Sequence, residues 1–190
     1  MSILETIKSK LKKMFGGESA ESGSQFLQWQ HPNLRRTHCF TCESNHLRVF
    51  ENNESKPKIG KDNHPFCECF YEDIEQKSVG SISNKGIQSP DVYLKAYGKL
   101  PDYYITKEEA RSLGWSEGKN LAHFAPGKMI GGDIYKNKPP KLPQKDGRTW
   151  YECDIDYESN KRNSKRLYYS NDGLMFYSPD HGTSTFYYVN

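Results

Sequence analysis

The last hundred residues of the chain change from helix signals to strand signals, and this order constrains the fold more than any other feature. Ser89-Pro90-Asp91 starts the ordered region as a helix: Ser can cap a helix, Pro suits its first turn, and Asp favours its positive end. We expect this helix to run to Tyr97 and to end at Gly98, because Gly readily adopts the left-handed conformation that terminates helices.

Two further short helices are expected before the strands begin. Thr106 and Glu109 fit a capping box, which predicts a helix that stops at Gly114. A third short helix is expected over residues 120–124, ahead of Pro126.

The chain after Gly131-Gly132 has the alternation that is typical of strands. Residues 149–155 can alternate faces at period two, and Asn171-Asp172-Gly173 is a hairpin signal. The other candidate strands carry Tyr, Phe and Leu: Arg166–Ser170, Leu174–Ser178 and Ser184–Val189. Helices followed by strands predict an α+β domain in which short N-terminal helices pack on an antiparallel β-sheet.

Composition limits both the core and the class of ligand. Apolar residues make up 34% of the chain, mean hydropathy is −0.92, and no apolar run approaches the length of a membrane span. Thirteen Tyr residues offset the shortage of aliphatic side chains, since Tyr buries ring area and also suits base stacking. The net charge of +3 is too small to argue for polyanion binding, so an RNA ligand would require basic residues focused in one cleft.

The N-terminal part of the chain is organised differently. Residues 1–15 carry apolar side chains at helical spacing with Lys mostly on the other side, which predicts an amphipathic helix. Docking of this helix on a neighbouring segment is favoured over binding to a membrane surface or a partner, which stays open. Residues 16–24 have the composition of a flexible linker, residues 25–71 form a Cys/His-rich module, and residues 72–88 are expected to be a connector.

The Cys/His-rich module holds four of the five Cys residues as two pairs: Cys39, Cys42, Cys67 and Cys69. Paired thiols separated by a loop fit a structural zinc site. Because the module has few aliphatic residues to bury, we expect a metal ion or disulfides to stabilise its fold. The second pair is Cys-x-Cys, and His64 could replace one of its members. Two disulfides, or unpaired thiols, are the alternatives.

A short segment of this module resembles a known phage protein. His64-Pro65-x-Cys67-x-Cys69 is similar to the cysteine-bearing tail of head-morphogenesis proteins of the MuF type. The match covers six residues.

The C-terminal region also carries the groups that RNA cleavage requires. Attack by the 2′-hydroxyl on the adjacent phosphorus needs a base, an acid for the departing 5′-oxygen, and cations on the phosphoryl oxygens. Glu152 lies on a Trp-flanked candidate strand, His181 follows the last hairpin, and Arg162 and Arg166 share a basic segment. Taken singly, each of these residues is more often a solvated surface group than a catalytic one.

The order of motifs around these residues is more specific. From about residue 99 onward the chain carries Lys99-Leu-Pro-Asp-Tyr-Tyr-Ile-Thr-Lys107, Glu109-Ala110, Leu113-Gly-Trp115, Asn120-Leu-Ala122, Ala125-Pro-Gly-Lys128, Ile130-Gly-Gly-Asp-Ile134, Lys141-Leu-Pro143, Gly147-Arg-Thr-Trp150, Arg162-Asn-Ser-Lys-Arg166 and Asp180-His181. This ordered set resembles the barnase family of bacterial, guanyl-preferring ribonucleases over about 100 residues. The resemblance implies a barnase-like ribonuclease domain over residues 89–190 and says nothing about residues 1–88.

The resemblance implies a role for each matching residue. Glu152 matches the general base and His181 the general acid, and no metal takes part in the reaction. Three cations, Lys107, Arg162 and Arg166, match the groups that position the phosphate and stabilise its developing charge. Asp133 matches a buried carboxylate that holds the cationic groups. The base-reading segment is Tyr135, Lys136, Asn137 and Lys138, in which Tyr135 stacks on the base.

The chain departs from the family pattern at two positions. Pro139 stands where the family has an acidic residue that accepts hydrogen bonds from guanine, so base discrimination should be relaxed. Gly182 replaces the Tyr that follows the catalytic His, and Tyr187 or Tyr188 could compensate. The resemblance thus implies the cleavage chemistry without strict guanine preference.

The leading hypothesis from the sequence is a metal-independent endoribonuclease that acts as a bacterial toxin or effector on RNA. The alternatives are a non-catalytic RNA-binding module with a degraded site, and a zinc-dependent interaction protein that carries a ribonuclease fold. An acidic, barstar-like inhibitor is an expected partner by analogy. Because residues 1–15 lack the pattern of a secretory signal, we expect secretion or delivery to a target cell by a non-classical route, with a cytoplasmic location as the alternative.

Overall fold

A computed structural model describes residues 24–31, 40–59, 61, 67–158 and 161–190. The helix predicted over residues 1–15, nearly all of the predicted linker, and Cys39 and His64 lie outside these described residues. No helix within the described segments has the length and apolar character that a membrane crossing requires.

The described residues form ten strands, three α-helices and two 3-10 helices. In chain order they are β1 (Phe26–Gln30), α2 (Phe40–Asn45), β2 (Val49–Glu51), β3 (Phe70–Asp73), β4 (Gln76–Lys77), η1 (Gly86–Gln88), α3 (Pro90–Tyr97), β5 (Tyr104–Ile105), α4 (Lys107–Ser112), η2 (Leu121–His123), β6 (Met129–Tyr135), β7 (Trp150–Asp154), β8 (Arg166–Ser170), β9 (Met175–Ser178) and β10 (Tyr187–Val189).

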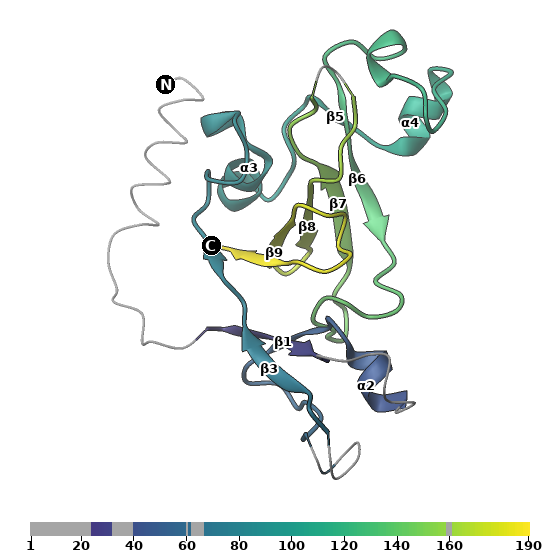
Figure 1. The fold of residues 1–190 in the computed structure, drawn as a ribbon. Coiled ribbons are helices and arrows are strands. Elements are labelled where there is room, and N and C mark those ends of the chain that lie inside the picture. Colours follow the sequence, from purple (N-terminus) through teal and green to yellow (C-terminus); the bar gives the residue numbers. More distant parts are fainter. Residues whose placement is uncertain (1–23, 32–39, 60, 62–66, 159–160) are drawn as a thin grey trace.

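The strands form two sheets, which Figure 1 shows one above the other. The small sheet has the order β2-β1-β3 and is antiparallel, and the large sheet has the order β4-β10-β9-β8-β7-β6-β5. The large sheet is antiparallel through β10 to β6, with a parallel strand at each edge. The predicted α+β fold with short helices on an antiparallel sheet is confirmed.

The three helices predicted after residue 88 form at about the expected residues, the third of them as the 3-10 helix η2. α3 begins after Ser89 and ends at Gly98, which has the left-handed φ of 69°. α4 begins after Thr106 with both bonds of the capping box present. Ser89 does not cap through its side chain, because its hydroxyl instead bonds the carboxylate of Asp91, which also accepts the N–H of Gly80 at 2.6 Å.

The central strands of the large sheet have different environments on their two faces. On β7, Cys153 points to the side on which Leu94 of α3 packs, and both join an apolar cluster with Leu167 and Met175. Trp150 alternates to the other face, where it packs near Phe176 with ring centroids 5.8 Å apart. Glu152 shares this second face, because it is two residues from Trp150.

The small sheet packs on that second face of the large one. The ring of Phe26 on β1 lies 4.9 Å from that of Phe176 and 4.5 Å from that of Tyr188. Val49 of β2 joins the same buried cluster. The segment expected to be a connector contains β4, which pairs with β10, so this segment contributes an edge strand to the large sheet.

Candidate active site

A β-bulge brings two carboxylates side by side. Between Gly131 and Asp133 the pairing of β6 with β7 shifts by one residue, so that Asp133 faces Glu152. Gly132 takes up the shift at a φ of +95°, and a Cβ on Gly131 would lie 2.5 Å from the Cβ of Cys153. The two Gly residues therefore permit the β-bulge and the close approach of the backbone to its neighbours.

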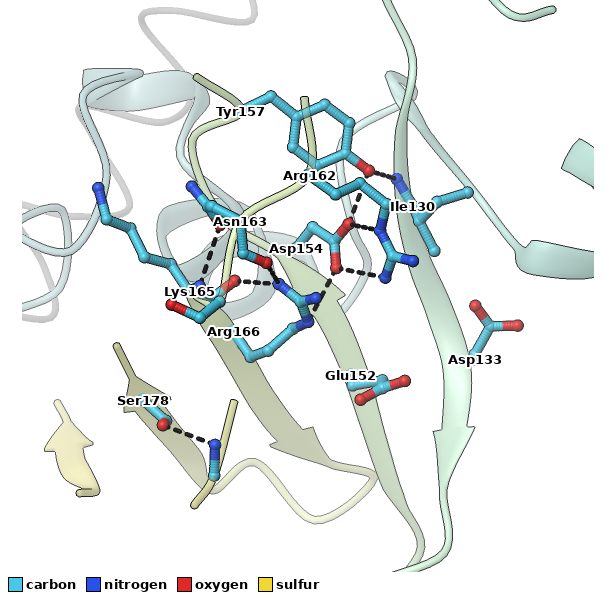
Figure 2. Close-up of polar contacts among 12 residues, drawn as sticks. Ile130, Asp133, Glu152, Asp154, Tyr157, Arg162, Asn163, Lys165, Arg166 and Ser178 are labelled. Carbon is cyan, nitrogen blue, oxygen red and sulfur yellow. Dashed lines mark hydrogen bonds and ion pairs between the residues drawn. The ribbon is translucent and has the colours of Figure 1, made fainter. Parts of the chain in front are cut away.

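A buried carboxylate on β7 holds two arginines of the basic segment. Asp154 accepts from Arg162 Nε at 2.6 Å and from Arg162 Nη2 at 3.1 Å, and its Oδ1 lies 3.0 Å from Arg166 Nε. The Tyr157 hydroxyl donates to the same carboxylate at 2.6 Å. Figure 2 shows both guanidiniums turned toward Asp154, with Glu152 on the same strand, β7, and Asp133 on the adjacent strand, β6.

The structure divides the role expected for Asp133 between two carboxylates. The carboxylate that holds the arginines is Asp154, which is 1% exposed, whereas Asp133 is only half-buried. Asp133 instead accepts the backbone N–H of Lys107 at 3.1 Å with each oxygen, at the first turn of α4. Alternation could have identified Asp154, since residues 152 and 154 of one strand share a face.

Lys107 reaches Glu152 across 45 residues of sequence. Its Nζ lies 2.7 Å from Glu152 Oε1, and the two side chains are 24% and 14% exposed. Lys107 thus stands at the start of α4 with its main chain bound to Asp133 and its side chain bound to Glu152.

His181 lies in a loop of residues 180–185, called here the His181 loop, that is anchored to the arginine segment. The His181 N–H donates to the carbonyl of Ser164 at 2.8 Å, and His181 itself has a φ of +62°. Asp180 organises the loop by accepting from the N–H groups of Thr183, Ser184 and Thr185 at 3.0–3.1 Å. Burial of the Asp180 carboxylate raises its pKa. Hydrogen bonds from the Ser178 and Ser184 hydroxyls and from the N–H groups of Ser184 and Thr185 outweigh that effect, so the pKa of Asp180 is lowered overall.

The surroundings of His181 lower its pKa below 6.5. Partial desolvation of the imidazole is the largest cause, although the residue as a whole stays exposed. The positive charges of Arg166 and Arg162 act in the same direction, and the negative charges of Glu152 and Asp154 oppose them. Among the predicted catalytic residues, Arg162, Arg166 and Glu152 thus act on the charge of the imidazole.

The predicted base-reading residues form a loop of residues 136–142, called here the base loop, next to Tyr135. The Tyr135 ring lies 4.6 Å from that of Tyr168, and burial followed by the charge of Glu152 raises the pKa of Tyr135. Asn137 is buried and closes the base loop, accepting from the N–H groups of Lys141 and Leu142 and donating to the Leu142 carbonyl. Lys136 and Lys138 are exposed.

The two departures from the family pattern have different structural settings. Gly182 lies at a φ of +68°, and a Cβ there would approach the hydroxyl of Tyr168 to 2.9 Å. Tyr187 lies under the ammonium of Lys77, and Tyr188 packs on Phe26, so these two rings are occupied elsewhere in the sheet. The expected compensation by Tyr187 or Tyr188 therefore has no support.

A cavity of about 790 Å³ lies on the opposite side of the sheet from Glu152. It is lined by Tyr151 and Tyr169, whose side chains alternate away from those of Glu152 and Tyr168. The predicted active-site residues are thus on the other face, and this cavity is separate from them.

Three of the predicted metal ligands also lie together. Cys42, Cys67 and Cys69 belong to one apolar cluster at the small sheet, in which Cys42 Sγ lies 3.5 Å from Cys67 Sγ. Cys39 is outside the described residues. His31 joins Cys42 and Cys69 with ligand atoms within 4.8 Å of one another. Sequence reasoning missed His31, although a His a few residues ahead of the Cys pairs was a usable signal.

Comparison with known proteins covers the same half of the chain. A family model described as ribonuclease matches residues 87–189. A ribonuclease of Heyndrickxia coagulans is 53% identical over 90 residues, which are 47% of this chain and 83% of that protein. Ribonucleases of Bacillus intermedius and Bacillus pumilus are each 53% identical over 90 residues, 47% of this chain and 56% of theirs. Through its C-terminal half, this chain belongs to the barnase family of bacterial ribonucleases.

Proposed function

We propose that this protein is an endoribonuclease that cleaves single-stranded RNA by attack of the 2′-hydroxyl on the adjacent phosphorus. Glu152 acts as general base and His181 as general acid. The observation that best supports this proposal is a pair of contacts on β7: Lys107 binds Glu152, and Asp154, two residues further on, binds Arg162 and Arg166. The ribonuclease relatives support the same reaction class.

The reaction proceeds in two steps. Glu152 takes the proton of the 2′-hydroxyl as its oxygen bonds to phosphorus, and His181 gives a proton to the departing 5′-oxygen. This step leaves a 2′,3′-cyclic phosphate and a free 5′-hydroxyl. Water then opens the cyclic phosphate with the roles reversed: His181 takes a proton from the water, and Glu152 returns one to the 2′-oxygen.

Three side-chain cations supply the charge stabilisation that the reaction needs, and we propose that it is metal-independent. Arg162 and Arg166 present fixed forks of donors that fit phosphoryl oxygens. Because Asp154 already holds both guanidiniums, they lose little freedom when the phosphate binds. Lys107 would leave Glu152 for the phosphate as the carboxylate becomes protonated.

The base site is proposed to be Tyr135 together with the backbone groups of the base loop. The acidic acceptor of the family is replaced by Pro139, so discrimination for guanine should fall. Comparison of kcat/KM for dinucleotides with each of the four bases 5′ to the scissile phosphate tests this. A guanine preference above about a hundredfold would contradict relaxed specificity.

The activity itself is tested with the full chain and RNA, both with and without EDTA, with cyclic-phosphate ends as the product to be detected. The matched variants are Glu152→Ala/His181→Ala, which should be inert, and His123→Ala, an exposed imidazole that should leave the rate unchanged. If the wild-type chain and the double variant are equally inactive but both bind RNA, the non-catalytic RNA-binding alternative holds instead.

We further propose a role as a toxin or effector that reaches its target by a non-classical route. An enzyme that degrades RNA without base restriction would harm the cell that makes it, which favours an acidic inhibitor as a partner. Expression of the wild-type chain should stop growth, and the double variant should not. Equal growth of both strains would count against the toxin role.

The N-terminal module is proposed to be stapled by zinc, with the ribonuclease domain beginning near Ser89. The close approach of Cys42, Cys67 and Cys69 supports a metal-bound module. Under this proposal the metal serves structure and takes no part in the acid–base steps, so the interaction-protein alternative predicts metal binding with no cleavage.

A further inference from the structure

The N-terminal module contains a cluster of metal-binding side chains outside the proposed active site. His31 follows β1, Cys42 lies in α2 and Cys69 precedes β3, and all three residues are buried. One ligand atom from each lies within 4.8 Å of the others. Cys67 adjoins them, with its Sγ 3.5 Å from Cys42 Sγ and accepting the N–H of Cys69 at 3.4 Å.

The spacing of these atoms fits metal ligands better than a disulfide. Bonded sulfurs lie about 2.05 Å apart, whereas two sulfurs on one tetrahedral zinc ion lie about 3.8 Å apart. The Cys42–Cys67 distance of 3.5 Å is close to the second value. Thiolate sulfur and imidazole nitrogen are also the donors that zinc prefers.

The module that carries this cluster has a small core. Apart from Phe26 and Val49, which pack on the large sheet, its described buried apolar residues are Trp29, Cys42, Phe50 and Cys69, so two of these four are themselves candidate ligands. A sheet with so little apolar area depends on a staple for its order. Metal occupancy should therefore decide whether the module keeps its shape.

The module touches the base loop through its backbone and through a lysine. The N–H of Val49 donates to the carbonyl of Lys141 at 2.7 Å, and Lys141 Nζ donates to the carbonyl of His46 at 3.0 Å. Lys141 is also one of the two residues whose N–H groups bind Asn137, the residue that closes the base loop. Displacement of the module would release this loop from one side.

The module also touches the His181 loop. The side-chain amide of Gln28 on β1 donates to the carbonyl of Ser184 at 3.3 Å and to that of Leu47 at 3.0 Å. Gln28 is 7% exposed, so this contact is shielded from water. One small sheet thus contacts both loops that the proposed reaction uses.

We propose that His31, Cys42, Cys67 and Cys69 bind one zinc-class ion, and that this ion positions the base loop and the His181 loop through the module. The residues of the module that touch these loops are positioning residues. The effect on catalysis rests on the proposed ribonuclease function, whereas metal binding and loop order do not.

Metal binding is tested on the full chain purified under reducing conditions, by elemental analysis and by the absorption of a cobalt-substituted sample. About one equivalent of zinc per chain is expected, with cobalt bands typical of tetrahedral sulfur-rich ligation. His31→Ala should weaken zinc binding at least about tenfold, and His123→Ala is the matched control. Zinc-free protein, or full zinc affinity in His31→Ala, would overturn the site.

Coupling to the loops is tested without substitution, by removing the ion from the wild-type protein with a chelator. Amide hydrogen exchange should speed up in residues 136–143 and 180–186, while α3 and β8 stay protected. KM for a dinucleotide should rise about tenfold or more and return when zinc is restored. Unchanged exchange in both loops overturns the coupling, whether or not the protein cleaves RNA.

A second variant separates the contact from the fold of the module. Gln28→Ala removes the bond to Ser184 and leaves all four proposed ligands in place. This variant should retain zinc, but amide hydrogen exchange in residues 180–186 should speed up and KM should rise. Normal exchange in this variant with zinc bound would show that the module does not position the His181 loop.

Discussion

Arg162 Nε donates to Asp154 Oδ2 at 2.6 Å, and Oδ1 of the same carboxylate lies 3.0 Å from Arg166 Nε. Asp154 is 1% exposed, so two cations share one buried anion. The arrangement keeps two guanidiniums side by side that would otherwise repel each other. It explains how a chain with a net charge of +3 can concentrate positive charge at one place.

Asp154→Asn should therefore be costly for stability. Removal of one partner from a buried ion pair destabilises a protein by about 3–5 kcal/mol, because the remaining charge stays uncompensated. We expect the urea-unfolding free energy of this variant to fall by an amount in that range. Asp133→Asn is the control, since among the described residues the Asp133 carboxylate accepts only from the Lys107 N–H, and it should cost less. Equal effects would contradict the central role of Asp154.

The pKa of His181 should depend on the positive charges of Arg166 and Arg162. Its lowered pKa means that the imidazolium is lost as pH rises through a value below 6.5. Because the first step needs the protonated form, kcat/KM of the free enzyme should decline above that pKa. Arg166→Ala should raise the pKa in an NMR titration, since it removes a positive neighbour. Arg111→Ala, at an exposed ion pair, should leave it unchanged.

Glu51 and Arg148 join the small sheet to the large one. Arg148 Nη1 lies 2.7 Å from Glu51 Oε1, and Arg148 Nη2 lies 2.8 Å from Asp172, with the Arg148 side chain 3% exposed. Glu51→Gln should lower the unfolding free energy by about 1–2 kcal/mol, since Arg148 keeps one carboxylate. Calorimetry should show one transition for the chain, and Glu117→Gln, in an exposed pair, should change little.

If calorimetry instead resolves two transitions, and Glu51→Gln shifts neither, the small sheet does not fold as part of the ribonuclease core. That result would favour a module that folds independently of the large sheet.

The contact between Gly182 and Tyr168 can be probed by a double variant. Gly182→Ala should cost about 1–2 kcal/mol, because it places a Cβ at a φ of +68° and 2.9 Å from the Tyr168 hydroxyl. Tyr168→Phe removes that hydroxyl, so the same substitution should cost less in its background. Additive losses in urea unfolding would show that the contact carries no strain.

Local patterns predicted much of the ribonuclease half. The bounds of α3 follow from Pro90 and Gly98, and β8 was predicted at Arg166–Ser170 as observed. These features depend on neighbours in sequence, where the chemistry of caps and alternation is decisive. The short edge strands β4 and β5 were not predicted, because they owe their form to the strands beside them.

The sequence by itself determined the fold class and, through its ordered motifs, the ribonuclease family of the C-terminal half, since caps and strand alternation are properties of neighbouring residues. Tertiary structure alone decided that Asp154 holds the arginines, that Lys107 reaches Glu152, and that His31 lies beside Cys42 and Cys69. It also decided that the small sheet contacts both the base loop and the His181 loop. These contacts join residues distant in sequence, and their partners are set by how layers pack, which no local pattern encodes.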